Sequence, residues 1–104
     1  MPDTTEARTV STVQIGPANA ERETGMTYRQ IDYATRKGFL KPLHVGGTGY
    51  SREWTHAELE VARLLGRLTE PRVGLSLETA ARIARSGAGR YEIAPGIVLD
   101  VTHA

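Results

Sequence analysis

The side chains that could take part in chemistry are mostly cations, and they form no catalytic or metal-binding pattern. The sequence contains no cysteine, which excludes disulfides, thiolate metal sites and cysteine nucleophiles. His44, His56 and His103 have no histidine partner at i+3 or i+4, so spacing offers no metal site. The glycine-rich run at 46–49 lacks the lysine and the following helix of a phosphate-binding loop. We therefore expect neither an enzyme nor a metal or other cofactor.

The positive charge is concentrated in one part of the chain. The net charge of +1 gives no general argument for a nucleic-acid partner. Residues 26–54, however, contain five basic and two acidic side chains, whereas residues 55–104 contain six of each. Such a cluster can be a solvated surface or a binding face. The elements that carry it decide between these two interpretations.

A short helix is predicted in the basic segment. Thr27 can cap its first turn while Gln30 reaches back, which is the capping-box pattern. The helix is expected from Tyr28 to Lys37 and stops at Gly38. Its inner face follows from the spacing of Ile31, Ala34 and Thr35. The opposite face, which carries the basic side chains, is then free to contact a partner.

The remaining elements are predicted from caps, breakers and apolar spacing. A first helix runs from Pro17 to about Thr24 and is closed by Gly25. Later helices begin after a Thr55–Glu58 capping box and after Ser76, and the last of them ends at Gly87. Strands are expected at 9–15, on both sides of a hairpin tip at 46–49, and in a terminal hairpin at 91–93 and 97–101.

Two short helices followed by a basic hairpin, here Leu43 to Trp54, form a winged helix-turn-helix. The expected fold is mainly α with a small β wing: four helices plus a short terminal β-hairpin. We divide the chain into a tail and possible strand (1–15), the winged-helix domain (16–86) and a C-terminal hairpin tail (87–104). The terminal strand could pair with residues 9–15 of its own chain or offer its edge to a second subunit.

Several separated segments also resemble a known family. The runs TGMTYRQIDY (24–33), KGFLKP (37–42), GYSREWT (49–55) and GLSLE (74–78) are similar to the MerR-type winged-helix DNA-binding domain. The resemblance covers roughly Gly16 to Ser86 and implies duplex DNA as the partner. It implies that Arg29 is the DNA-contacting arginine, that Tyr33 is the aromatic position of the recognition helix, and that Tyr50 and Arg52 are wing residues near the phosphate backbone.

The sequence departs from the family pattern at several positions. Asp32 stands where many members have arginine, Ala34 where many have tyrosine, and Pro17 with Glu21 replaces a more apolar first helix. A carboxylate facing phosphates weakens binding unless it pairs with Arg29 or Arg36, or accepts a hydrogen bond from cytosine. These positions bear on base preference and on the geometry of the first helix.

The predicted DNA-binding set combines the exposed side of the recognition helix with the wing. Arg29 can pair with guanine or with a phosphate, and the other cations contact the backbone. Tyr28 and Tyr50 can bind phosphate or pack the wing, and Lys41 can lie over apolar neighbours. The full set is Thr27, Tyr28, Arg29, Asp32, Tyr33, Arg36, Lys37, Lys41, Tyr50 and Arg52.

The resemblance narrows the function to three hypotheses. Larger MerR-type regulators have a long dimerisation helix and an effector segment after the fourth helix, and residues 87–104 are too few for one. The first hypothesis is therefore a small sequence-specific transcription regulator without an effector domain. The second is an excisionase-like recombination factor that binds cooperatively and bends DNA. The third is a protein-interaction module on the same scaffold.

The expected setting follows from the same hypotheses. We expect a bacterial or phage protein that self-associates on DNA as a dimer or cooperative multimer. No apolar run reaches the length of about 20 residues that spans a bilayer. A cytoplasmic, nucleoid-associated protein without a membrane partner is the resulting expectation.

Overall fold

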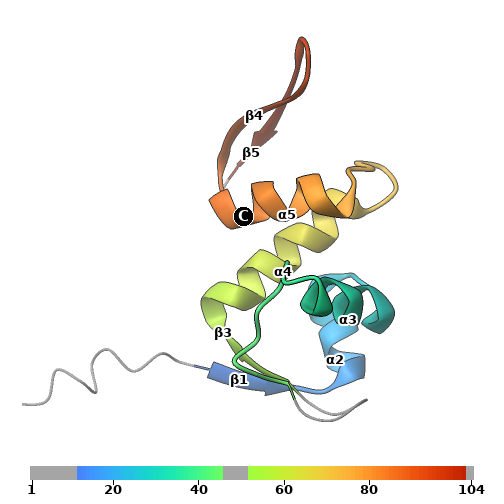
Figure 1. The fold of residues 1–104 in the computed structure, drawn as a ribbon, viewed down its shortest axis with the longest axis vertical. Helices are drawn as coiled ribbons and strands as arrows, with labels where there is room; N and C mark the ends of the chain where they lie inside the picture. Colours follow the sequence, from blue (N-terminus) through green and yellow to red (C-terminus); the bar gives the residue numbers. More distant parts are fainter. Residues whose placement is uncertain (1–11, 46–51, 103–104) are drawn as a thin grey trace, which may run out of the picture.

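The chain folds as four helices with two small antiparallel sheets (Figure 1) in a computed structural model that describes residues 12–45 and 52–102. This confirms the expected winged-helix fold class. The helices are α2 (Pro17–Thr24), α3 (Tyr28–Arg36), α4 (His56–Thr69) and α5 (Leu77–Ser86). The strands are β1 (Thr12–Ile15), β2 (His44–Val45), β3 (Arg52–Thr55), β4 (Gly89–Ala94) and β5 (Ile97–Val101).

The helix-turn-helix is built by α2 and α3 at the predicted positions. Pro17 occupies the first turn of α2, and Gly25 ends the helix with φ of 77°, a left-handed conformation that glycine adopts without strain. Both bonds of the capping box at α3 are present: the Gln30 amide donates to Thr27 Oγ1 (3.1 Å) and the Thr27 amide donates to Gln30 Oε1 (2.9 Å). The turn geometry is therefore fixed by local contacts.

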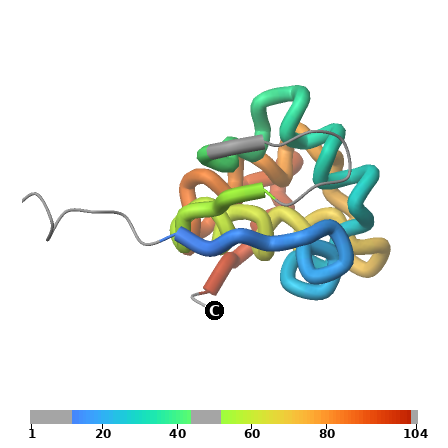
Figure 2. The backbone as a smooth tube through the Cα atoms, turned by 90° about the horizontal axis from the view of Figure 1, so that it is seen from below, coloured from blue at the N-terminus to red at the C-terminus, as the bar shows by residue number. Residues whose placement is uncertain are grey.

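The wing is a three-stranded sheet of order β1-β3-β2. Strand β1 pairs antiparallel with β3, from Thr12 opposite Thr55 to Ile15 opposite Arg52, and the two strands lie side by side in Figure 2. The proposed pairing of residues 9–15 with the terminal strand is therefore wrong. Alternation along β3 explains the actual pairing, because Trp54 turns inward and joins Ile15 in the core.

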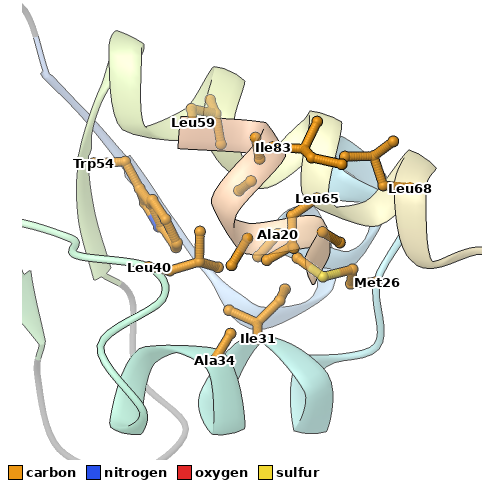
Figure 3. Close-up of a cluster of buried hydrophobic side chains, with 14 of the residues drawn as sticks. Ala20, Met26, Ile31, Ala34, Leu40, Trp54, Leu59, Leu65, Leu68 and Ile83 are labelled. Atoms are coloured by element: carbon orange, nitrogen blue, oxygen red, sulfur yellow. The ribbon is translucent and has the colours of Figure 1, made fainter. Parts of the chain in front are cut away.

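The core lies between the helices and the wing sheet. Ile31 and Ala34 of α3 point towards Leu65 of α4, and Leu40 lies beside Trp54 (Figure 3). Helix α2 crosses α4 closely at Gly66, where an added Cβ would overlap the backbone carbonyl of Thr24. No helix of the described residues is long and apolar enough to cross a membrane.

The terminal hairpin, β4 and β5, is longer than expected and projects beyond α5 (Figure 1). Its base is attached to the body: Val101 is buried, and the Tyr91 hydroxyl donates to the Gly87 carbonyl at the end of α5 (2.5 Å). The register shifts between Glu92 and Ala94, which is a β-bulge near the tip. Tyr91 and Leu99 also pack against the core, so the half of the hairpin nearer to α5 is anchored.

Candidate nucleic-acid interface

The exposed side of α3 carries a row of cations around an aromatic ring. Arg29, Tyr33 and Arg36 follow the i, i+4, i+7 spacing of one helix face, and all three are exposed. They line a groove of about 570 Å³ whose other wall comes from the α4–α5 region (Thr69, Leu75 and Leu77). Lys37 lies at the end of the row, with Nζ 5.7 Å from the centre of the Tyr33 ring. This surface can bind phosphates and stack on apolar groups.

Asp32 is neutralised by two arginines. Its Oδ1 is 2.7 Å from the Arg52 guanidinium, and its Oδ2 is 3.2 Å from Arg36 Nε. Pairing with Arg36 is one of the arrangements expected to offset the carboxylate. The pairing with Arg52, which was not expected, joins the wing to the recognition helix. The charge of Asp32 is therefore compensated within the fold.

Arg52 is buried, unlike the wing cation that the family resemblance implied. Its side chain is only 6% exposed, and its guanidinium lies 5.1 Å from the centre of the half-buried Tyr28 ring. Side chains two residues apart in a strand share a face, so Arg52 points to the same side as the core residue Trp54. That alternation could have revealed its burial from sequence. A direct DNA contact by Arg52 stays a prediction, and its observed contacts fix the wing against α3.

The N-terminus of α3 is already occupied by groups of the protein. Thr27 and Gln30 satisfy each other, and the Tyr28 amide donates to Glu21 Oε2 (2.6 Å). Glu21 thus brings a carboxylate to the helix end that the sequence assigned to a phosphate or base edge. The contact depends on the packing angle of α2 and α3, which the local sequence does not reveal. DNA contacts by Thr27 and Tyr28 remain predictions.

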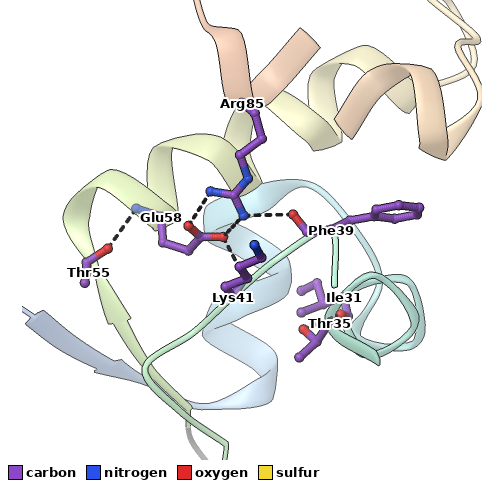
Figure 4. Close-up of polar contacts among 7 residues, drawn as sticks. All are labelled: Ile31, Thr35, Phe39, Lys41, Thr55, Glu58 and Arg85. Carbon is purple, nitrogen blue, oxygen red and sulfur yellow. Dashed lines mark hydrogen bonds and ion pairs between the residues drawn. The ribbon is translucent and has the colours of Figure 1, made fainter. Parts of the chain in front are cut away.

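A second polar cluster fixes the segment between α3 and the wing (Figure 4). The Glu58 amide donates to Thr55 Oγ1 (2.9 Å), as predicted, but the Glu58 carboxylate does not complete the capping box. It accepts instead from the Lys41 amide (2.7 Å) and from two nitrogens of Arg85 (2.7 and 2.5 Å). Arg85 also donates to the Phe39 carbonyl (2.9 Å). The predicted reciprocal bond was wrong because non-local partners take up this carboxylate.

This cluster bears on the interface through Lys41. Its backbone is held by Glu58, whereas the residue as a whole is exposed and free to contact a phosphate. The hydrogen bond to Glu58 raises the pKa of the Arg85 guanidinium above its usual value.

Tyr50 lies outside the described residues, as does the wing tip at 46–51. Within 12–45 and 52–102, no group of three His, Asp or Glu side chains could hold a metal ion. The structure therefore brings together Arg29, Tyr33, Arg36 and Lys37 on one surface, with Asp32 and Arg52 behind it.

Comparison with known proteins adds one finding. A family model described as MerR HTH family regulatory protein matches residues 18–87. This span contains α2, α3, the wing, α4 and α5. No curated protein matches the chain.

Proposed function

Because the chain belongs to the MerR helix-turn-helix family of DNA-binding regulatory proteins, we propose that it is a small transcription regulator that recognises a specific duplex sequence. Helix α3 lies in the major groove in this proposal, and the wing lies along the neighbouring phosphate backbone. The observation that carries it is the exposed row of Arg29, Tyr33 and Arg36 on a helix whose buried side is fully apolar at Ile31 and Ala34.

The proposed roles differ along this surface. Arg29, in the first turn of α3, is placed to reach a base edge, where an arginine fork pairs with guanine. Arg36, Lys37 and Lys41 neutralise phosphates, and Tyr33 packs against the sugar-phosphate chain. In this proposal Arg52 is a positioning residue: it contacts Asp32 and the Tyr28 ring and holds both in place.

The pairing of Asp32 favours DNA binding over the interaction-module hypothesis. That hypothesis drew on an unpaired carboxylate in a surface meant for phosphates. Asp32 instead contacts Arg36 and Arg52, so the repulsion is reduced by a cation on each side. We keep the interaction module only as an outcome of the binding experiment.

The proposal also includes self-association on DNA. A helix of nine residues contacts only a few base pairs. Helix-turn-helix proteins recognise longer DNA sequences by placing two or more copies on repeated half-sites. We place the protein with the nucleoid in the cytoplasm, because that is where its proposed ligand is found.

The test is selection of bound sequences from a pool of random duplexes, followed by fluorescence anisotropy on the selected and a scrambled duplex. The exposed cations around α3 are Arg29, Arg36, Lys37 and Lys41, and Asp32 partly neutralises Arg36. Together they predict that log K falls with log salt concentration with a slope of about −3 per protomer. Selective binding with that slope supports the proposal. Failure to enrich any sequence, together with no binding at low salt, would contradict it. Strong bending of the bound duplex would instead favour the recombination factor.

A further inference from the structure

The outer edge of β4 is a strand edge without a partner inside the described chain. In residues 12–45 and 52–102, β4 pairs with β5 alone, so the other edge of β4 has no strand beside it there. Apolar side chains are exposed towards its tip: Ile97 is 56%, Val98 52% and Ile93 36% exposed. Exposed edges of this kind pair readily with another strand.

The charges along β4 indicate which strand pairs with this edge. A twofold-symmetric antiparallel pair must place one residue directly opposite its own copy. Centring the pair on Arg90 or on Glu92 sets like charges against each other, which is destabilising. Centring it on Tyr91 places Arg90 opposite the partner's Glu92, and Glu92 opposite the partner's Arg90. Both side chains are exposed. Inside the hairpin, Arg90 lies opposite Asp100 and Glu92 Oε2 accepts from the Gly96 amide (3.0 Å), so each would keep that neighbour and gain an opposite charge across the new strand pair.

We infer that β4 pairs antiparallel with β4 of a second copy, in the register centred on Tyr91, to give a four-stranded sheet of order β5-β4-β4-β5. This deepens the self-association proposed above by naming its surface, and it requires no DNA. The hairpin then becomes part of a four-stranded sheet, and sheets of three or more strands are more stable than a single hairpin.

The outer edge of β5 is the alternative edge for self-pairing. A β5 pair centred on Leu99 would place Val98 of each copy opposite Asp100 of the other copy. An aliphatic chain facing a carboxylate gives no cross-strand stabilisation, whereas opposite charges do. Centring β5 on Val98 would instead place Val98 opposite its own copy and Ile97 opposite the partner's Leu99, which are aliphatic pairs only. Opposite charges are matched on β4 alone, and the Val98→Cys variant described below distinguishes the two edges.

The β-bulge between Glu92 and Ala94 confines the regular edge of β4 to residues 89–92. The proposed pairing is therefore short: it is centred on Tyr91, with one Arg90–Glu92 contact on each side.

The test uses two charge-reversal variants, Arg90→Glu and Glu92→Arg, in sedimentation equilibrium without DNA. In a dimer of either variant alone, both contacts between residues 90 and 92 of the two copies join like charges. We therefore expect its dimerisation to weaken by at least about tenfold. In an equimolar mixture both pairs between the two β4 strands join opposite charges again, so we expect the heterodimer to be tighter than the dimer of either variant alone. The Arg90→Glu side chain still lies opposite Asp100 of its own hairpin, so the affinity of the wild type is regained only in part. A folding defect in either variant could not be repaired by mixing, and circular dichroism of each variant records it directly.

A disulfide measurement tests the register in the cysteine-free chain. Directly opposite residues have Cα atoms about 4.5–5.5 Å apart, within the range of a disulfide. Mixing Arg90→Cys with Glu92→Cys should give a mixed disulfide faster than either variant forms alone, and Val98→Cys on β5 should stay unlinked. A monomeric wild type, a mixture that associates no better than its components, or growth beyond a dimer with concentration would overturn the inference.

Discussion

Replacing Asp32 with asparagine tests whether the wing is held to the recognition helix by a buried ion pair. The Arg52 side chain is 6% exposed and the Asp32 side chain is 38% exposed. Removing one partner of a fully buried pair costs about 3–5 kcal/mol, because the other charge is left without compensation. Solvent reaches Asp32 and asparagine still offers an oxygen, so we expect a loss of about 2 kcal/mol.

Arg36→Ala is the matched control, since it removes the other ion pair of the same carboxylate. The Arg36 side chain is 73% exposed, and such surface pairs contribute less than about 0.5 kcal/mol. Unfolding in urea can be followed by the fluorescence of Trp54, the one tryptophan of the sequence, which is 1% exposed and two residues from Arg52. The Asp32→Asn transition should shift clearly, and the Arg36→Ala transition hardly at all.

A double variant decides whether the loss comes from an uncompensated charge. Adding Arg52→Met to Asp32→Asn removes the buried cation, so we expect the double variant to regain part of the lost stability. Equal losses for Asp32→Asn and Arg36→Ala would refute the reasoning. So would a double variant that is no more stable than Asp32→Asn alone.

Three further variants test other contacts. Gly66→Ala should destabilise by about 2 kcal/mol in urea despite its gain of about 1 kcal/mol in helix propensity, because the new Cβ overlaps the Thr24 carbonyl; an unchanged or higher midpoint would be inconsistent with that packing. Glu21→Gln keeps an acceptor for the Tyr28 amide and removes a negative charge from the end of α3, so duplex binding should tighten a few-fold in anisotropy at low salt. An unchanged affinity would place Glu21 away from the DNA. Glu58→Gln should cost about 1–2 kcal/mol in urea because its carboxylate joins three donors, and a loss near zero would argue against that cluster.

The helices could be predicted from sequence because their ends are set locally. Pro17 and Gly25 bound α2, and Thr27 with Gln30 starts α3. In each case the decisive contact lies within one turn of the chain. The buried positions Ile31 and Ala34 followed from spacing, so the exposed face of the recognition helix could be predicted as well.

The contacts that escaped prediction join segments far apart in sequence. Strand β1 pairs with β3 across some 40 residues, and the Glu58 carboxylate reaches Arg85 rather than its own helix end. Sequence alone does not rank such partners. Arg52 differs in kind, because its alternation with Trp54 was visible in the sequence and marked it as facing inward.

The central claim, that α3 reads duplex DNA through its exposed face, is tested most directly by anisotropy with the selected duplex and two arginine variants. Arg29→Ala removes the cation proposed at a base edge, and Arg67→Ala removes an equal charge from a groove beside β5. For Arg29→Ala we predict that the free energy of binding weakens by about 1–3 kcal/mol and that the preference for the selected duplex is lost. For Arg67→Ala we predict nearly unchanged binding. Equal effects of the two variants, or full binding by Arg29→Ala, would contradict it.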